Sequence, residues 1–322
     1  KNKLLYKLEK LKLNHNYKHC IMPFSGGRDS SYALFLAVKE FNLKPITYTY
    51  DWGMVTDLAR RNISRMCSIF NIENIIVADN LAYKRLLIKK NVLAWLKKPK
   101  LGMVNIFTSG DKHFFKHIID IKKQTGISID LWGTNPLEVT FFKSGFLGVK
   151  PIFEEKFVYN TGFKRQLNYH SKRFKEFLYN PSYFNMSILD NISGEYFRSI
   201  KKKTNHFQIY DYWKWNEKEV DETLDKFGWE KAIDTKSTWR IGDGAAAFYN
   251  YIYYTMAGFT EHDTFRSNQI REGDMDRKTA LDLVHEENKP RYQNIRWFLD
   301  IINVDYKSTI KIINSNKLNL IN

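Results

Sequence analysis

Short apolar runs alternate with longer amphipathic segments through the first half of the chain. The apolar runs are rich in β-branched and aromatic residues, as is typical of buried strands, and they span His19–Phe24, Pro45–Tyr50, Asn74–Ala78 and Ser128–Trp132. The segments between them have apolar residues at helical spacing, over Ser31–Phe41, Val55–Phe70, Ala82–Lys97 and Lys112–Thr125. This alternation predicts an α/β fold in which a doubly wound parallel sheet carries helices on both faces.

The pattern changes after about Leu137. Phe, Tyr, Lys and Asn dominate as far as Trp215 without a clean period, so we expect an irregular insertion there. Helical spacing returns later, over Glu217–Phe227, Gly244–Ala257 and Arg277–Glu287. Asp276 is the expected N-cap of the last of these. The tail, Asn303–Asn322, is expected to form a loosely held terminal helix. The polar stretch Glu261–Met275 is expected to lie between helices. The C-terminal region is therefore predicted to be mostly helical and rich in aromatic residues.

Parallel sheets bind ligands beyond the carboxyl ends of their strands, where the strand order reverses. The loops after the four predicted strands are therefore the candidate ligand loops, namely Ser25–Ser30, Asp51–Gly53, Asp79–Asn80 and Gly133–Asn135. The first of them reads Ser-Gly-Gly-Arg-Asp-Ser and opens a helix. Two glycines let the backbone approach a phosphate, and the helix N-terminus directs N–H groups and a positive dipole end toward it.

The side chains of this loop also suit a nucleotide. Ser25, Ser30 and Ser31 supply short hydroxyl groups, and Asp29 beside phosphates implies a bridging Mg²⁺ ion. The Gly-x-x-x-x-Gly-Lys-Ser/Thr pattern is absent, which argues against transfer of a γ-phosphate. A plain surface turn with Ser30 as the helix N-cap is the alternative.

Ser-Gly-Gly-x-Asp-Ser resembles the PP-loop of the ATP pyrophosphatase superfamily, whose members cleave ATP between the α and β phosphates and adenylate a second substrate. The resemblance implies that ATP and Mg²⁺ are the cofactors and that Ser25, Gly26, Gly27, Asp29, Ser30 and Ser31 hold the nucleotide. Asp51, Gly133 and Thr134 are expected to face it from the neighbouring loops, although Asp51 could also be a plain turn residue. Glu138 lies one turn after the fourth predicted strand, where a nucleotide-facing role and a structural role are both open. It implies a PP-loop domain over residues 1–140 and a substrate or partner region over 141–322.

Other residues could carry chemistry. Arg240 and Asp243 lie in a glycine-flanked loop before an aromatic helix, and this loop is a second candidate anion site. The candidate catalytic residues are Arg28 and Arg240, which would stabilise charge on the α-phosphate, and Asp29. Three further pairs are expected to be structural or solvated rather than catalytic or metal-binding: His262 with Asp263, His113 with His117, and Arg60 with Arg61.

Several weaker motifs resemble those of the N-acetyl sugar amidotransferase family. They are Gly110-Asp111, Leu131-Trp132-Gly133-x-Asn135-Pro136, Arg240-x-Gly-Asp243-Gly, and Arg266 through Ile270-Arg271-x-Gly273-x-Met275-x-Arg277. The resemblance implies a nucleotide-linked acetamido sugar as substrate and ammonia from a separate glutaminase subunit, in surface-glycan synthesis. Family members carry paired Cys-x-x-Cys elements, whereas this chain has only Cys20 and Cys67, so we expect no zinc site.

Composition leaves the partner open. The net charge of +16 suits an anionic partner, but Lys and Arg are spread through the chain and an AT-rich genome also inflates lysine. A PP-loop tRNA-modifying ligase, and a scaffold that binds nucleotide without turnover, therefore stay as alternatives. No apolar run approaches the ~20 residues of a membrane span, and no leader pattern is recognised, so we expect a cytoplasmic protein.

Overall fold

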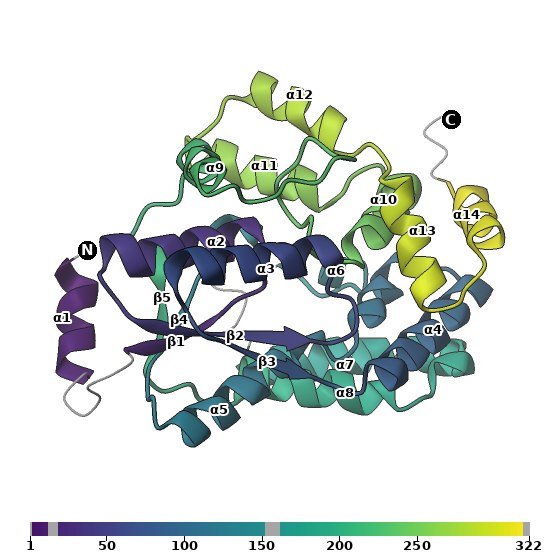
Figure 1. Cartoon of the computed structure of the whole chain (residues 1–322). Coiled ribbons are helices and arrows are strands. Elements are labelled where there is room, and N and C mark those ends of the chain that lie inside the picture. Colours follow the sequence, from purple (N-terminus) through teal and green to yellow (C-terminus); the bar gives the residue numbers. More distant parts are fainter. Residues whose placement is uncertain (1, 12–18, 152–161, 318–322) are drawn as a thin grey trace.

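Five parallel strands form one sheet in the order β3-β2-β1-β4-β5 (Figure 1). This computed structural model describes residues 2–11, 19–151 and 162–317. The strands are β1 (Cys20–Pro23), β2 (Pro45–Asp51), β3 (Asn74–Ala78), β4 (Asp130–Trp132) and β5 (His206–Gln208). The order reverses beside β1, since β2 and β4 pair on its two sides, with Ile21 opposite Ile46 and opposite Asp130. The predicted doubly wound parallel sheet is therefore confirmed.

Helices cover both faces of this sheet. Helices α2 (Arg28–Phe35) and α3 (Asp57–Phe70) lie on one face, and α5 (Phe114–Thr125) covers the other (Figure 1). Helix α2 continues as a π-helical turn over Leu36–Glu40. Alternate strand residues point to opposite faces. Cys20 and Met22 accordingly join the core beneath α2 and α3, while Ile21 joins the core beneath α5.

The predicted ends of these elements shift by a few residues. Helix α2 begins at Arg28, three residues earlier than predicted, so the glycine loop leads directly into its first turn. Helix α3 begins at Asp57 because the Thr56 hydroxyl accepts a hydrogen bond from the Ala59 amide. Helix α5 begins at Phe114 after a short 3-10 turn over Asp111–His113.

The expectation of an irregular segment between Leu137 and Trp215 was wrong. The described part contains α6 (Phe142–Gly145), α7 (Gly162–Tyr179), α8 (Ser187–Glu195), a π-helical turn over Tyr196–Ile200, and strand β5. On α7 and α8, polar residues such as Arg173 and Asn191 are buried while large apolar residues are exposed, so the apolar spacing there does not mark the face that packs against the rest of the chain. Strand β5 comes from beyond residue 140 and pairs with β4, so the sheet draws on both predicted regions.

Six helices complete the C-terminal region: α9 (Glu217–Lys226), α10 (Ala246–Ala257), α11 (Glu261–Arg271), α12 (Arg277–Glu287), α13 (Tyr292–Ile301) and α14 (Tyr306–Ser315). The predicted polar linker after residue 260 is in fact helix α11, which starts at a capping box of Thr260 and Asp263. Asp276 caps α12 as predicted. The predicted terminal helix is α14, although residues 318–322 lie outside the described part.

A second helical core lies beside the sheet. It joins α10, α13 and α14 to α4 (Leu81–Lys97) and to a 3-10 segment over Leu101–Thr108 (Figure 1). Within the described ranges, no helix is long and apolar enough to span a membrane.

Candidate active site

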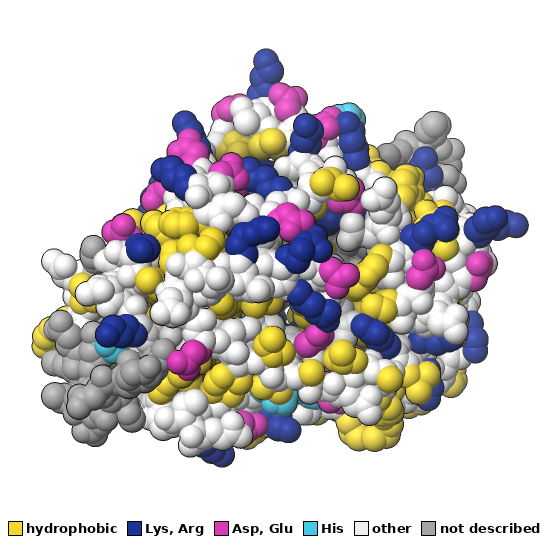
Figure 2. Space-filling view, in the orientation of Figure 1, with side chains coloured by type: hydrophobic (Ala, Val, Ile, Leu, Met, Phe, Trp, Pro, Cys, Tyr) yellow, Lys and Arg dark blue, Asp and Glu magenta, His cyan; other side chains and the backbone are white. Residues whose placement is uncertain are grey.

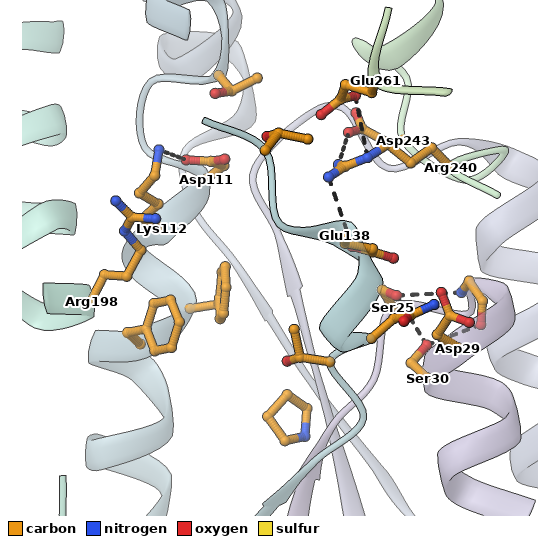
Figure 3. Close-up of a pocket in the computed structure, with 18 of the residues that line it drawn as sticks. Ser25, Asp29, Ser30, Asp111, Lys112, Glu138, Arg198, Arg240, Asp243 and Glu261 are labelled. Carbon is orange, nitrogen blue, oxygen red and sulfur yellow. Dashed lines mark hydrogen bonds and ion pairs between the residues drawn. The ribbon is translucent and has the colours of Figure 1, made fainter. Parts of the chain in front are cut away.

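The loop Ser25–Ser30 joins β1 to α2 at the point where the strand order reverses. Its two serine hydroxyls lie 3.0 Å apart, the Gly27 amide donates to Ser25 Oγ over 3.3 Å, and Ser30 Oγ is 3.1 Å from the Gly27 carbonyl. These bonds hold both hydroxyls at the mouth of the loop, next to the first turn of α2. Both serines line a cavity of about 600 Å³ (Figure 3).

Gly26 is the residue that fixes the path of this loop. Its φ is +70°, and a Cβ placed there would lie 2.5 Å from the Ala59 carbonyl oxygen and 2.7 Å from Ile63 Cγ1. The loop backbone therefore packs directly against α3, and Gly26 does not itself line the cavity. Ser31 lies one step into the helix; it is fully buried, and its hydroxyl has no hydrogen-bond partner among the described residues.

Asp29 is anchored from the C-terminal region. Its Oδ1 atom accepts hydrogen bonds from Trp215 Nε1 at 2.7 Å and from Arg28 Nε at 3.2 Å, and its main-chain carbonyl accepts one from the Tyr210 hydroxyl at 2.6 Å. Asp29 is 7% exposed and lines the cavity. Its carboxylate is thus held in place at the N-terminus of α2.

Glu138 is a second carboxylate beside Asp29 at this end of the cavity. It follows β4, lines the same cavity, and accepts a hydrogen bond from Trp239 Nε1 at 2.6 Å. Burial raises the pKa of Glu138 to about 7, the negative charge of Asp29 adds to this increase, and Arg240 opposes it. The two carboxyl groups form a set of hard oxygen donors whose charge a divalent cation would balance.

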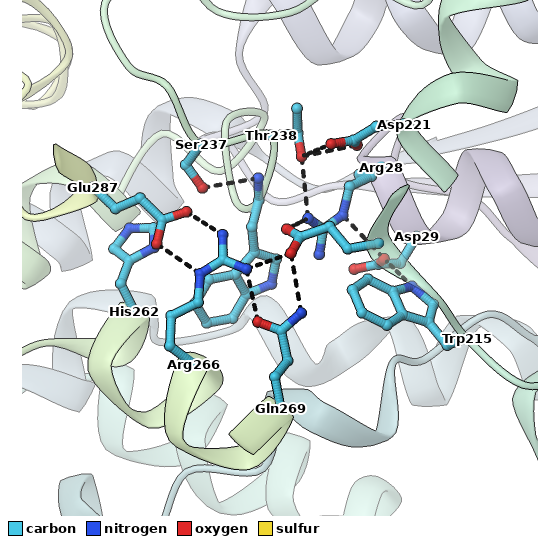
Figure 4. A network of polar contacts seen from close by, with 12 residues as sticks. Arg28, Asp29, Trp215, Asp221, Ser237, Thr238, His262, Arg266, Gln269 and Glu287 are labelled. Carbon is cyan, nitrogen blue, oxygen red and sulfur yellow. Dashed lines mark hydrogen bonds and ion pairs between the residues drawn. The ribbon is translucent and has the colours of Figure 1, made fainter. Parts of the chain in front are cut away.

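Arg28 lines the cavity and belongs to a buried ionic network (Figure 4). Its Nη1 atom donates to Glu217 Oε1 at 2.7 Å and to Thr238 Oγ1 at 3.1 Å. Although burial opposes the charge, Asp29 and Glu217 hold the pKa of Arg28 above its usual range. Its side chain is only 1% exposed, so its observed contacts are those of an anchor for α2 rather than of a group turned toward a ligand.

The network continues through Arg266 of α11. This guanidinium contacts Glu217 on α9, Gln269 Oε1 at 2.7 Å, and Glu287 on α12 through both Nε, at 2.9 Å, and Nη2 (Figure 4). Helix α2 therefore meets α9, α11 and α12, which lie far from it in the sequence, behind the phosphate loop. His262 lies at the edge of this network, packed edge-on to Trp239 with ring centroids 5.3 Å apart.

Arg240 is placed where the sequence predicted a second anion site. Its backbone has a φ of +54°, and its guanidinium lines the cavity between three carboxylates: Glu261 at 3.3 Å, Asp243 at 3.6 Å and Glu138 at 3.8 Å (Figure 3). Burial opposes ionisation of Glu261, but Arg240 and Lys143 together lower its pKa to about 2. Arg240 is thus the cation that the structure brings next to the Asp29–Glu138 pair.

The remaining predicted nucleotide contacts separate into two groups. Gly133 and Thr134 line the cavity, and Gly133 is required by packing because a Cβ there would lie 2.3 Å from the Ala33 Cβ. Asp51 does not line it, since its carboxylate accepts from the Gly53 amide at 2.9 Å and pairs with Arg60. Arg61 forms a bidentate pair with Glu230 at the surface, as expected of a solvated helix face.

The other histidine and cysteine predictions concern metal binding. Among the described residues, no group of three or more His, Cys, Asp or Glu side chains is placed to hold a metal ion, and Cys20 and Cys67 are buried free thiols. His117 packs on Tyr50, with ring centroids 4.9 Å apart. Burial lowers the pKa of both His113 and His117, with the charges of nearby lysines adding to it.

The cavity extends well beyond the loop. Phe115 and Trp132 stack at 4.9 Å with ring planes 12° apart and line its floor, together with Phe114. On the far side, Lys112 and Arg198 project from the opposite wall (Figure 3), where both pair with Glu195. Arg165, Gln166 and Tyr169 of α7 also line this distal end.

Sequence patterns did not reveal this distal end or the supports behind the loop. Trp215, Lys143, Glu261 and Arg198 come from segments without a recognisable motif, and only the fold brings them together. Glu138 was the exception, because its position one turn after β4 indicated a crevice residue.

Comparisons with known proteins give partial matches. No protein-family profile matches the chain. It is 27% identical over 142 residues to a 7-cyano-7-deazaguanine synthase from Clostridium botulinum strain 657, and 25% identical to that of strain Loch Maree; each match covers 43% of this chain and 63% of the relative. The chain thus spans less than two thirds of the length of these curated relatives.

Two solved structures align along most of the chain, each at 13% identity. NMN synthetase from Francisella tularensis has a TM-score of 0.42, and the alignment covers 91% of this chain and 93% of the synthetase. A U34-tRNA thiolase from Methanococcus maripaludis has a TM-score of 0.35, and the alignment covers 95% of this chain and 80% of the thiolase. Scores this low describe a loose likeness only. In its Ser-Gly-Gly-x-Asp-Ser loop, in the strand-to-helix setting of that loop and in its parallel sheet, the chain resembles the PP-loop ATP pyrophosphatases.

Proposed function

We propose that this protein is an ATP-dependent amidotransferase that adenylates the acetamido oxygen of an N-acetyl sugar and replaces that oxygen with nitrogen from ammonia. The observation that carries the proposal is the arrangement of the Ser25–Ser30 loop, Asp29, Glu138 and Arg240 around one end of a cavity that continues to an aromatic floor. The near end suits a triphosphate and the remainder has room for an acceptor. A large cavity with a few convergent polar groups is the usual form of such a site.

The reaction has two steps. The amide oxygen attacks the α-phosphorus atom, so that the bond to the β-phosphate bridging oxygen breaks and pyrophosphate leaves. Ammonia then adds to the activated carbon; the C–O bond breaks, AMP leaves with the oxygen, and loss of protons gives the acetamidino product. AMP transfer thereby turns a poor leaving group into a good one, and no redox partner is needed.

The residues of this chain have separate roles in this scheme. The serine hydroxyls and the first turn of α2 receive the departing pyrophosphate, and Arg240 stabilises charge that develops on the α-phosphate. Asp29 and Glu138 would hold Mg²⁺ with the nucleotide, and the bound ion would offset phosphate charge. The incoming nitrogen loses its protons to solvent, because a Glu138 carboxylate bound to the cation would be a weak base.

The distal end fits an acceptor that combines rings with negative charge. Phe114, Phe115 and Trp132 offer apolar ring faces, while Lys112 and Arg198 lie at the far wall. A nucleotide-linked acetamido sugar has both features. We further propose that a separate glutaminase subunit supplies the ammonia and that the enzyme acts in the cytoplasm, in surface-glycan synthesis.

The match to 7-cyano-7-deazaguanine synthases favours a second candidate. The same site could adenylate an acceptor built on a nucleobase, including one within tRNA, because the stacked pair Phe115 and Trp132 would equally accept a planar heterocycle. Both candidates share the AMP-forming first step and differ only in the acceptor.

One experiment separates the two. The protein is incubated with ATP, Mg²⁺, an ammonium salt and either acetamido nucleotide sugars, deazapurines or total tRNA, and the acceptors are then analysed by mass spectrometry. The proposal predicts a sugar in which NH has replaced oxygen, with one AMP released per product. AMP release that depends on the deazapurine or the tRNA, and not on any sugar, would establish the second candidate instead.

A further inference from the structure

Helices α7 and α8, with the π-helical turn that extends α8, form a hairpin whose outer face is unusually apolar. We call residues 162–200 the hairpin. Of the 21 large hydrophobic side chains that are exposed among the described residues, 11 lie here, with exposed fractions of 41–65%. They are Phe163, Leu167, Phe174, Leu178, Tyr179, Phe184, Met186, Leu189, Ile192, Tyr196 and Ile200.

These side chains form one surface. On α7, the exposed positions Phe163, Leu167, Phe174 and Leu178 follow helical spacing, and α7 packs against the turn after α8. The Phe174 ring lies 6.2 Å from that of Phe184, which links the two arms of the hairpin. The exposed area is on the order of 1,000 Å², above the few hundred Å² that a monomer usually exposes in one patch. Figure 2 shows hydrophobic side chains along the lower edge, where Figure 1 places α7 and α8.

The exposed charges of the hairpin and its immediate continuation are all positive. Lys164 and Lys175 flank the apolar face on α7, and Lys201 and Lys202 follow its last residue. The three acids in the same stretch are engaged elsewhere: Glu176 with Lys100, Asp190 with Lys84, and Glu195 with Arg198. Lys98 and Lys100 also lie over the Tyr179 ring, at 4.2 and 4.1 Å.

The cavity cannot account for this charge. The charged side chains that line it are six cations and six anions, so the chain's excess of +16 is not concentrated there. A helix with Phe and Leu on one side and lysines at its borders is typical of segments that lie in the plane of an anionic lipid surface. A second copy of the chain would bring the same lysines against each other, in addition to the net charge of both copies, and therefore fits this face less well.

We propose that the hairpin docks on a membrane surface that contains anionic lipid, with its apolar face among the headgroups and its lysines against lipid phosphates. The inner side of the same hairpin carries Arg165, Gln166 and Tyr169, which line the distal end of the cavity. Docking would therefore bring the acceptor end of the site to the lipid surface. The proposal does not depend on which acceptor the enzyme uses.

The test is co-sedimentation of the purified chain with vesicles of phosphatidylcholine alone and of phosphatidylcholine mixed with phosphatidylglycerol. We expect binding to the anionic vesicles that weakens as salt is added, and little binding to the neutral ones.

Lys164→Gln with Lys175→Gln should weaken binding about tenfold or more, and Leu167→Gln with Leu189→Gln should do the same. Matched controls are Lys218→Gln, whose side chain is 86% exposed on α9, and Ile233→Gln, at 99% exposed; both should bind as the parent does.

All the substituted side chains are exposed, so each variant should fold as the parent does. Thermal unfolding verifies this for each variant. Equal binding of the hairpin variants and the controls would overturn the proposal. So would a stable dimer in light scattering that Leu167→Gln with Leu189→Gln converts to a monomer, because the apolar face would then be covered by a second copy. Absence of binding to anionic vesicles at low salt would overturn it as well.

Discussion

At the scale of single residues, the phosphate loop depends on backbone shape as much as on side chains. Gly26 and Gly27 look equivalent in the sequence, yet only Gly26 has a positive φ and direct contact with α3. Sequence reasoning identified the loop because a strand, two glycines and a helix start follow each other locally. It could not rank the glycines, because the contact of Gly26 with Ala59 and Ile63 depends on tertiary packing.

Replacing Gly26 with Ala should therefore destabilise the protein. The new Cβ would meet the Ala59 carbonyl at 2.5 Å in a left-handed backbone, and strain of this kind costs on the order of 1–3 kcal/mol. The free energy of unfolding in urea measures the effect. Gly27→Ala is the matched control: the nearest atom to its Cβ would be Ser25 Oγ at 3.3 Å and its φ is −73°, so the loss should be clearly smaller. Equal losses would contradict this account of the loop.

Glu138 should make stability depend on pH. Its pKa is raised from 4.5 to about 7 by burial, with Asp29 adding to the rise and Arg240 opposing it, so the folded chain holds a proton that the unfolded chain has lost. This contribution to stability is present below about pH 4.5 and is lost as the pH rises through 7. Relative to Glu138→Gln, the parent should lose about 1–3 kcal/mol of unfolding free energy between pH 5 and pH 8.

The matched measurement adds MgATP. If Asp29 and Glu138 hold the ion, bound Mg²⁺ should reduce the pH-dependent difference between the parent and Glu138→Gln, because the cation stabilises the ionised acid. A difference that is the same at every pH, with or without MgATP, would show that Glu138 does not titrate in this range.

At the scale of elements, the phosphate loop is held by helices that lie far away in the sequence. Arg28 at the start of α2 reaches Glu217 on α9, and Arg266 on α11 reaches the same carboxylate and Glu287 on α12 (Figure 4). The alternation of strands and helices predicted α2 and the sheet, since those patterns are local. The network was not predictable, because α11 reads as a polar linker whose charges are satisfied only after folding.

Arg266→Gln should show how much this network contributes. Removing one member of a buried ionic group leaves Glu287 and Glu217 without their shared cation, which typically costs 3–5 kcal/mol. Arg61→Gln serves as control, because its pair with Glu230 is at the surface with 55% of the arginine side chain exposed, and it should change stability far less than Arg266→Gln does. Urea unfolding of both variants makes the comparison; similar small effects would mean that the helices are joined by apolar packing alone.

At the scale of the whole molecule, the sheet positions one long site between two different walls. The loops after β1 and β4 form one wall, and the inner sides of α7 and of the turn after α8 form the other (Figures 1 and 3). The first wall could be predicted, because its residues follow strands. The second could not, since the apolar spacing of α7 marks its outer face and not the face that meets the cavity. That outer face is also the proposed lipid-binding surface.

The identity of the nucleotide product tests the central claim most directly. ATP labelled in its α-phosphate is incubated with the protein, Mg²⁺, an ammonium salt and the pool of candidate acceptors, and the labelled products are separated. The account predicts labelled AMP with an equal amount of pyrophosphate, and loss of both in Asp29→Asn, whose unfolding free energy is measured to verify that it is folded. Labelled ADP with free phosphate, or AMP formation that Asp29→Asn leaves unchanged, would contradict the account.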